Sequence, residues 1–261
     1  MSSAPTVDVA AAVRQLEEEG YAVLPSLYSE DDVRFFRETL LELYEEIGSP
    51  PARADGFVEP APEVEIGPAG IVFRRLTHRR PNVIPRLFRP EAIEVARGLL
   101  GPGMYLELPA GVVSDHTRPF FEWHTHIGGV DDSTFRQKRI YPRFERSHRV
   151  TMLHYLDDLR PDNGPLLVLP RKLSDPTEPP YSVSQERWPG QVEINCPRGS
   201  VVILEQCIWH AALQKLTPGL RLYVGFYFAA AEAEATPLLD PSLSEYAGDD
   251  ALFRSVLPRR A

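Results

Sequence analysis

Hydrophobic residues recur at helical spacing in the first hundred residues of the chain. One amphipathic segment runs from Val7 to about Glu19, and a short strand from Tyr21 to Leu24 follows it before Pro25. A clearer helix follows Ser29, which can cap it, and ends at Gly48. Its apolar stripe should lie on a sheet, and consists of Val33, Phe36, Leu40, Leu43 and Ile47.

Two further segments complete this N-terminal part. The Pro, Gly and Glu content from Ser49 to Gly70 predicts an irregular connection. Pro90 to Leu100 is predicted to be another helix, with Pro90 in the first turn and Gly101 at its end.

After Gly101 the pattern changes to short apolar runs separated by turn residues, which is typical of an antiparallel sandwich. In the last run, apolar residues alternate with Arg221, Tyr223, Gly225 and Tyr227, so Arg221 should point into a cavity or to solvent. The predicted strands are Tyr105 to Val113, Val150 to Asp157, Pro165 to Leu169, Ser200 to Glu205 and Arg221 to Ala229.

The length of 261 residues and the absence of a repeat or long linker favour a single domain. We divide it into a mostly helical part (1–100), a β core (101–235) and a C-terminal segment (236–261). Cys196 and Cys207 are expected to be buried small hydrophobic residues, because no second pair exists to build a zinc site.

The formal net charge of −9 argues against general binding to nucleic acid or anionic membranes. The N-terminus lacks the pattern of a signal peptide and no long apolar run is present, so a cytoplasmic location is expected. Oligomeric state is left open. Two basic stretches, Arg136 to Arg149 and Arg74 to Arg80, are either solvated surface or an electropositive cover over a small acidic substrate.

The histidines suggest metal chemistry. His124 and His126 stand two residues apart, so in an extended segment both side chains project to the same face. His210 ends a strongly apolar run and can supply a third ligand from a distant strand. Imidazole suits iron, zinc, copper and nickel, so this ligand set does not choose the metal.

Several segments resemble, in order and spacing, the phytanoyl-CoA dioxygenase family of iron(II)- and 2-oxoglutarate-dependent oxygenases. The resemblance covers most of the chain. Arg221 follows His210 at the spacing of the family's arginine. The other matching segments are Gly20 to Pro25, Gly101-Pro-Gly, Trp123-His124, Tyr155 to Leu166, Gly199 to Leu204 and Trp209-His210.

The resemblance implies a mainly β fold with flanking helices, namely the double-stranded β-helix or cupin-like jelly roll. It also implies Fe(II) at His124 and His210, O2 as cosubstrate, and 2-oxoglutarate with one carboxylate held by Arg221. Thr151 and Asn163 are added as candidate cosubstrate-binding residues, although nothing in the sequence prefers them to their neighbours.

One position departs from the family pattern. The family has an aspartate or glutamate two residues after the first histidine, where this chain has His126. A carboxylate balances one charge of a ferrous ion, so three neutral imidazoles would leave the iron more positive. Asp131 or Asp132 is the first alternative to His126 as ligand, and Glu122 and Glu205 are weaker ones.

Three hypotheses follow for a small-molecule substrate whose identity the sequence does not disclose. The first is a 2-oxoglutarate-dependent hydroxylase or oxidase with His124, His126 and His210 as an unusual triad. The second is an oxygenase that binds its substrate directly on a three-histidine iron without 2-oxoglutarate. The third is a catalytically silent binding protein.

Three other sets of residues receive structural interpretations. Trp123 and Trp209 are expected to pack in the core, and His154 to be a core histidine, with a cosubstrate hydrogen bond as its alternative. Lys172 and Lys215 are expected to be solvated.

Overall fold

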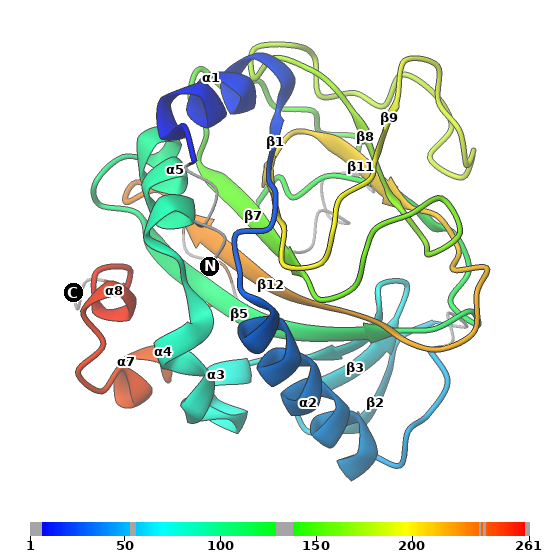
Figure 1. The fold of residues 1–261 in the computed structure, drawn as a ribbon. Coiled ribbons are helices and arrows are strands. Elements are labelled where there is room, and N and C mark those ends of the chain that lie inside the picture. The colour runs from blue at the N-terminus through cyan, green and yellow to red at the C-terminus, as the bar shows by residue number, and fades with distance from the viewer. Residues whose placement is uncertain (1–6, 53–55, 129–137, 235, 237–238, 259–261) are drawn as a thin grey trace.

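The structure is a computed structural model that describes residues 7–52, 56–128, 138–234, 236 and 239–258. Its centre is two antiparallel sheets that face each other (Figure 1). The larger sheet has eight strands, in the spatial order β1 (Tyr21–Leu24), β10 (Val201–Glu205), β7 (Arg149–Tyr155), β12 (Arg221–Ala229), β5 (Tyr105–Ser114), β4 (Gly70–Phe73), β3 (Val64–Gly67) and β2 (Val58–Ala61). The smaller sheet has four strands, in the order β6 (Phe121–His124), β11 (Trp209–Ala212), β8 (Leu166–Leu169) and β9 (Val192–Ile194).

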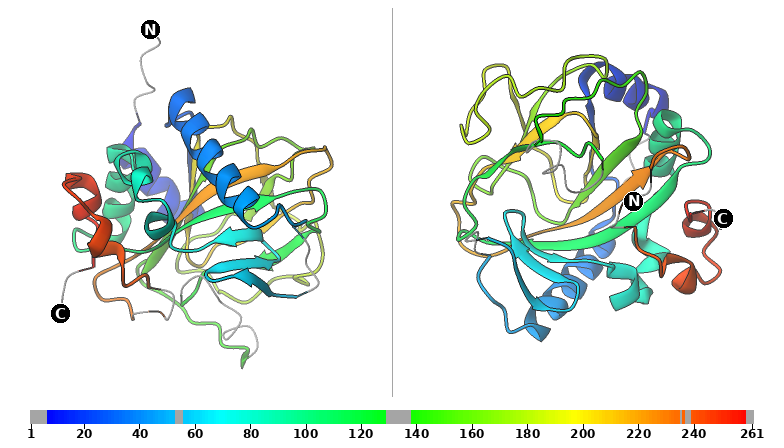
Figure 2. Two further views of the ribbon diagram at one scale, coloured as in Figure 1. Left: turned by 90° about the horizontal axis from the view of Figure 1, so that it is seen from below. Right: turned by 180° about the vertical axis from the view of Figure 1, so that it is seen from behind.

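Helices cover the outer face of the larger sheet, as the two views in Figure 2 show. The N-terminal helices begin at side-chain caps: Asp8 accepts from Ala11 N, and Ser29 forms a capping box with Asp32. The helices are α1 (Val9–Glu19), α2 (Glu30–Glu46), α3 (Leu76–Arg79), a 3-10 turn (Pro81–Val83), α4 (Ile84–Leu87), α5 (Pro90–Leu100), α7 (Leu243–Tyr246) and α8 (Ala251–Arg254). Among the described residues, no helix combines the length and the apolar character needed to cross a membrane.

Most of the predicted elements are confirmed. The strand Tyr21–Leu24 and the helix Pro90–Leu100 have the predicted bounds, and the five strands predicted after Gly101 are present to within a residue or two at their ends. The apolar stripe of α2 lies on the large sheet. Phe36, Leu40 and Leu43 are 0–1% exposed and belong to the hydrophobic core between the helices and this sheet. The prediction of a two-sheet sandwich is therefore correct.

The prediction of an irregular connection from Ser49 to Gly70 is wrong. Val58–Ala61 and Val64–Gly67 form β2 and β3, which extend the large sheet beyond β4. Alternation within β3 explains the strand, because Val64 and Ile66 are buried and Glu65 faces the other way. The prediction failed because strands of four residues between Pro and Gly turns leave little periodic signal.

Alternation along the strands separates two hydrophobic cores: an outer core between the helices and the large sheet, and an inner core between the two sheets. On β7, Val150 and Met152 join the helices in the outer core, whereas Leu153 and Tyr155 face the smaller sheet. On β11, His210 shares a face with Val168 of the neighbouring strand, and Val168 belongs to the inner core. The interior between the sheets therefore receives side chains from β7, β12 and β11 together.

Gly111 of β5 lets α2 approach the large sheet closely. A Cβ built on Gly111 would overlap Cδ2 of Leu40, which is fully buried. On the paired strand, a Cβ at Gly225 would meet nothing nearer than 3.5 Å, on the Tyr227 ring. The two glycines therefore make a matched pair for testing this contact.

Gly111→Ala should destabilise the protein by about 1–3 kcal/mol, because the overlap forces α2 away from the sheet. Gly225→Ala should change the free energy of unfolding by less than about 0.5 kcal/mol. Urea denaturation followed by circular dichroism measures both. Equal stability of the two variants would contradict the proposed close contact.

Candidate metal centre

The pairing of β6 with β11 brings two of the predicted ligands together. His124 and His210 are partners in the antiparallel register, so their side chains lie on the same face of the smaller sheet. Their ring centroids are 4.1 Å apart. Both point to the interior because Trp123 and Trp209, their neighbours in the chain, pack on the outer face with Trp188.

His126 joins them from the segment that follows β6. Its backbone N–H donates to the carbonyl of Gln206 at 2.8 Å, which ties this segment to the turn between β10 and β11. Its ring centroid lies 4.8 Å from that of His210 and 5.5 Å from that of His124. One nitrogen from each ring lies within 4.8 Å of the others, so the structure gathers the three predicted histidines.

Backbone carbonyls orient two of the rings. Nδ1 of His124 lies 2.7 Å from the Glu122 carbonyl oxygen, and Nδ1 of His210 lies 3.0 Å from that of Ile208. A carbonyl oxygen only accepts, so each Nδ1 carries the proton and each Nε2 keeps its lone pair. Nε2 of His210 lies 3.1 Å from Nε2 of His126. Convergent imidazole lone pairs of this kind fit a divalent cation such as Fe(II).

The three rings are buried, and the surroundings of His210 disfavour its protonation. Their exposed fractions are 9% for His124, 8% for His126 and 4% for His210. Burial holds the pKa of His210 well below its ordinary value, and the neighbouring His124 and His126 lower it further. Neutral imidazole is the form that binds a metal ion, so His210 is held in the form that a metal ion needs.

Two of the alternative acids are placed away from this role. Glu122 is exposed and contributes its backbone carbonyl to His124. Glu205 is buried, with one oxygen bound by Ser147 Oγ at 2.9 Å and the other by Cys207 N at 2.7 Å. Asp131 and Asp132 lie outside the described residues. Within the described part of the chain, the candidate metal ligands grouped here are the three histidines.

Arg221 lies at the start of β12 and is 3% exposed. Its Nη1 donates to the Gly164 carbonyl, and its guanidinium lies 5.7 Å from each of the rings of Tyr155 and Tyr223. No carboxylate of the described residues pairs with it, and its Nε has no hydrogen-bond partner among them. A buried cation without a counter-ion is ready to bind an anionic ligand.

Thr151 and Asn163 occupy different surroundings. Thr151 is paired with Tyr227 and lies on the interior face of β7, where it is 2% exposed. The Asn163 side chain is held by the protein itself: its Nδ2 donates to the Asp158 carbonyl at 2.9 Å, and its Oδ1 accepts from Lys215 Nζ at 2.6 Å. Their proposed roles in cosubstrate binding stay predictions.

Lys215 is not solvated as expected, being 4% exposed. Its ammonium group donates to Asn163 and to Thr217 Oγ1, the latter at 2.6 Å. Burial lowers its pKa. It therefore fixes the turn that carries Gly164, next to Arg221.

Sequence reasoning missed Arg118 and Tyr227. Arg118 is 1% exposed, and the ring of Tyr227 lies 5.6 Å from that of His126. The alternation along β12 already placed Tyr227 on the face of Arg221, so a signal for it existed. Arg118 stands in a short Pro- and Thr-containing connection that has no periodic pattern, and nothing in the sequence marked it as buried.

The core interpretations of Trp123, Trp209, Cys196 and Cys207 are confirmed. The tryptophans pack in one cluster with Trp188, and both cysteines are free and buried. Burial raises the pKa of the Cys196 thiol to about 11, so it is not an activated nucleophile.

His154 is also a core histidine, on the outer face of β7 and away from the three-histidine site. It is fully buried and stacks on Tyr28 with 3.7 Å between ring centroids. Burial lowers its pKa to about 3, and Arg89 lowers it further while Asp32 opposes this.

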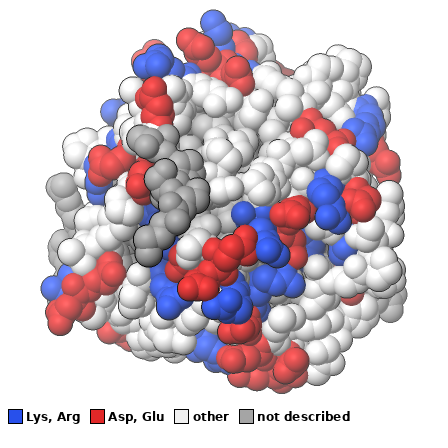
Figure 3. Space-filling view, in the orientation of Figure 1, with Lys and Arg blue, Asp and Glu red and all other residues white. Residues whose placement is uncertain are grey.

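Several cations of the basic stretches form ion pairs where the structure describes them. Arg74 pairs with Glu65, Arg75 with Glu63, and Arg80 with Glu46. In the second stretch, Arg146 pairs with Glu232, and the buried Arg149 pairs with Glu107. Figure 3 accordingly shows basic and acidic side chains interleaved on one face of the molecule. Lys138, Arg139 and Arg143 are exposed, and Arg136 lies outside the described residues.

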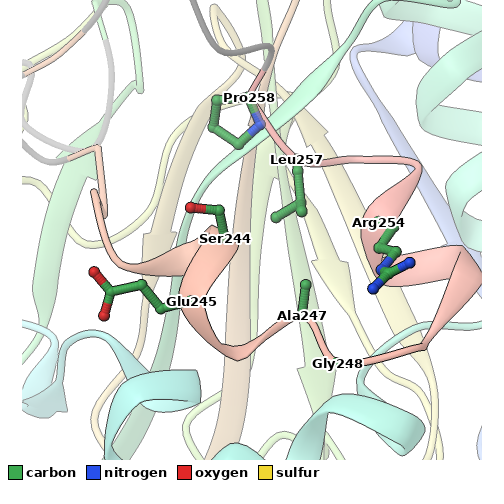
Figure 4. Close-up of a pocket in the computed structure, with 7 residues that line it drawn as sticks. All are labelled: Ser244, Glu245, Ala247, Gly248, Arg254, Leu257 and Pro258. Atoms are coloured by element: carbon green, nitrogen blue, oxygen red, sulfur yellow. The ribbon is translucent and has the colours of Figure 1, made fainter.

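A hollow of about 500 Å³ lies at the C-terminal helices rather than at the histidines (Figure 4). It is formed by α7, α8 and the residues after them, on the helical side of the large sheet. It contains one acid and one arginine but no histidine or cysteine, so it offers no comparable ligand set. Its lining residues are Ser244, Glu245, Ala247, Gly248, Arg254, Leu257 and Pro258.

Comparison with known proteins identifies the family of this chain. The phytanoyl-CoA dioxygenase (PhyH) family matches residues 16–222, and the chain belongs to this family. Its members are non-heme iron dioxygenases that use 2-oxoglutarate and O2. The ectoine dioxygenase of Stutzerimonas stutzeri (strain A1501) is 29% identical over 160 residues, 60% of this chain. The match spans 48% of that relative, about half of its length.

Solved structures confirm the jelly-roll fold. The 2-oxoglutarate-dependent carbocyclase SnoK from nogalamycin biosynthesis has a TM-score of 0.63 at 20% identity, covering 90% of this chain and 89% of SnoK. EctD from S. alaskensis, solved with 2-oxoglutarate and 5-hydroxyectoine, has a TM-score of 0.62 at 21% identity, covering 90% and 80%. HygX from Streptomyces hygroscopicus, solved with nickel and 2-oxoglutarate, has 0.60 at 15%, covering 87% of each chain.

Replacing His210 by alanine should weaken Ni(II) binding by at least about 100-fold, because it removes one of three converging nitrogens. His116→Ala, which removes an exposed histidine outside the three-histidine group, is the matched control and should bind as the wild type does. Isothermal titration calorimetry measures both affinities. Unchanged binding by His210→Ala would show that the metal binds elsewhere.

His154 should make the protein less stable in acid. Its pKa is lower in the folded chain than the ordinary 6.5, so only the unfolded chain gains this proton as pH falls from 6.5 toward about 3. Each pH unit in that window should cost about 1.4 kcal/mol from this group. His154→Phe should remove that slope in denaturant unfolding measured at several pH values. Parallel curves for the two proteins would contradict the assignment.

Proposed function

We propose that this protein is an iron(II)- and 2-oxoglutarate-dependent oxygenase that oxidises a small organic molecule. Its iron would be held by His124, His126 and His210, and its cosubstrate by Arg221. The observation that carries the proposal is the gathering of three buried imidazoles, with a buried arginine on the facing strand β12 that has no ion-pair partner among the described residues. Membership of the PhyH family and the jelly-roll fold support the same activity.

Different residues of the site would bind the metal and the cosubstrate. The carbonyls of Glu122 and Ile208 orient His124 and His210, so their Nε2 atoms keep the lone pairs that would hold the metal. Bound Fe(II) would supply the activation of O2 that the family's chemistry needs. Arg221 would bind the distal carboxylate of 2-oxoglutarate through the guanidinium nitrogens that the Gly164 carbonyl leaves available.

Gly164 is important for this position of Arg221. It has a φ of +67°, and a Cβ there would lie 2.9 Å from the Leu213 carbonyl oxygen and 3.2 Å from Arg221 Nη1. Any larger residue would push the guanidinium out of its place. The turn therefore has a functional as well as a conformational need for glycine.

The substrate is proposed to be a small molecule that enters beside His126 and Tyr227. The Tyr227 side chain folds over Gly225, with its hydroxyl oxygen 3.6 Å from a Cβ built there. Burial raises the pKa of Tyr227, so its hydroxyl stays protonated and can donate a hydrogen bond to a substrate oxygen. We further propose that residues 1–261 form one oxygenase domain, whose jelly-roll core is residues 101–235.

A second candidate function rests on His126 itself. Three imidazoles give the iron no protein carboxylate, and an oxygenase with such a centre can bind an organic substrate on the metal without 2-oxoglutarate. Arg221 would then anchor an acid group of that substrate. This candidate and the first agree on the metal and differ on the cosubstrate.

The discriminating experiment is turnover of 2-oxoglutarate. The full chain loaded with Fe(II) under air should convert 2-oxoglutarate to succinate, even without substrate, and Arg221→Gln should lower this rate by about 10-fold or more. Chromatography of succinate measures the rate, and His116→Ala is the control. Tight iron binding without succinate would favour the second candidate, whereas absence of iron binding would exclude both.

His126→Asp tests what the substituted position does. It restores the carboxylate of the family pattern, so Fe(II) should still bind and succinate should still form. His126→Ala should lose both, because it leaves two ligands. If His126→Asp binds iron no better than His126→Ala, the second position after His124 does not contribute a ligand.

A further inference from the structure

Two buried arginines, not one, lie at the Arg221 end of the site. Arg118 is 1% exposed and Arg221 is 3% exposed, which places them among the most buried charged side chains described. Neither forms an ion pair with any described Asp or Glu, and the Nε of each lacks a hydrogen-bond partner. By contrast, the buried Arg149 donates to both carboxylate oxygens of Glu107, through its Nε and Nη2.

The two guanidinium groups are neighbours across one short stretch of backbone. Nη2 of Arg118 donates to the Leu213 carbonyl at 2.6 Å. That same oxygen lies 2.9 Å from the Cβ position of Gly164, which is 3.2 Å from Arg221 Nη1. The Leu213 carbonyl and Gly164 therefore separate the two cations.

Burying two neighbouring guanidinium groups costs free energy unless an anion binds beside them. Burial and the positive charge of Arg221 lower the pKa of Arg118 to about 9, so a charged Arg118 is disfavoured at this position. The hydroxyl-bearing rings of Tyr155 and Tyr223 beside Arg221 bring no negative charge, because burial raises the pKa of both hydroxyls. A carboxylate placed between or beside the two arginines would relieve this repulsion.

We propose that Arg118 is a second cation of the cosubstrate pocket, which acts with Arg221 to bind the distal carboxylate of 2-oxoglutarate. This inference rests on the proposed function. It assigns to Arg118 a binding role that explains why a positive charge is kept buried beside Arg221 without an acidic partner among the described residues.

The competing explanation is that Arg118 has only a structural role, as a hydrogen-bond donor to backbone carbonyls. It donates to the carbonyls of Pro119 at 2.8 Å and Ala212 at 3.4 Å, as well as to that of Leu213. Lysine and glutamine both lose this three-carbonyl fork, but only lysine keeps the charge. Comparing Arg118→Lys with Arg118→Gln therefore separates the effect of the positive charge from the effect of the hydrogen bonds to the backbone.

The experiment measures the affinity of the Ni(II)-loaded full chain for 2-oxoglutarate by calorimetry. Arg118→Gln should weaken it by about 10-fold or more, whereas Arg118→Lys should stay within about 3-fold of the wild type. Both should bind Ni(II) like the wild type, since Arg118 touches none of the three histidines. Arg160→Gln, an exposed arginine already paired with Asp162, is the control for long-range charge.

Equal loss of affinity in the lysine and glutamine variants, or no loss in either, would overturn the inference and leave the proposed function intact. A wild-type protein that binds Ni(II) but not 2-oxoglutarate would overturn both. If the variants do not fold, a crystal structure of the wild-type protein with Ni(II) and 2-oxoglutarate decides the matter. A ligand carboxylate at ion-pair distance from Arg118 is expected, and one that contacts Arg221 alone contradicts the role.

Discussion

The pairing of β6 with β11 is the constraint on which the site depends. It sets His124 opposite His210, and the alternation of each strand sends both rings inward while the adjacent tryptophans pack outward. A shift of one residue in this register would exchange histidine for tryptophan at the centre of the molecule. The Gln206 carbonyl then holds the segment after β6 so that His126 completes the group.

Charge is distributed unevenly around this centre. The histidine end has no carboxylate ligand among the described residues, and burial lowers the pKa of His210 there. The other end holds two buried guanidinium groups without described acidic partners. The interior between the sheets is therefore suited to anionic ligands, although the chain as a whole is acidic with a formal net charge of −9. The local placement of charged side chains, rather than the net charge, therefore determines which ligands this part of the interior favours.

The sequence predicted the strands and helices whose periodicity was strong, and it predicted the three histidines that the structure gathers. It could not predict the hairpin of β2 and β3, because strands of four residues beside turn residues give no lasting pattern. It also missed the burial of Arg118 and Lys215, since long charged side chains are usually exposed and only tertiary contacts bury them. The sequence likewise could not show that both carboxylate oxygens of Glu205 accept hydrogen bonds from Ser147 and Cys207, because these contacts form only in the folded chain.

The central claim is that three imidazoles, without a protein carboxylate, hold the iron. A crystal structure of the full chain loaded anaerobically with Fe(II) tests it most directly, because it also defines the ligands contributed by any part of the chain. The account predicts one nitrogen each from His124, His126 and His210 on the metal, with water or cosubstrate in the other positions. A carboxylate oxygen of Asp131, Asp132 or another acid on the iron in place of His126 would contradict it.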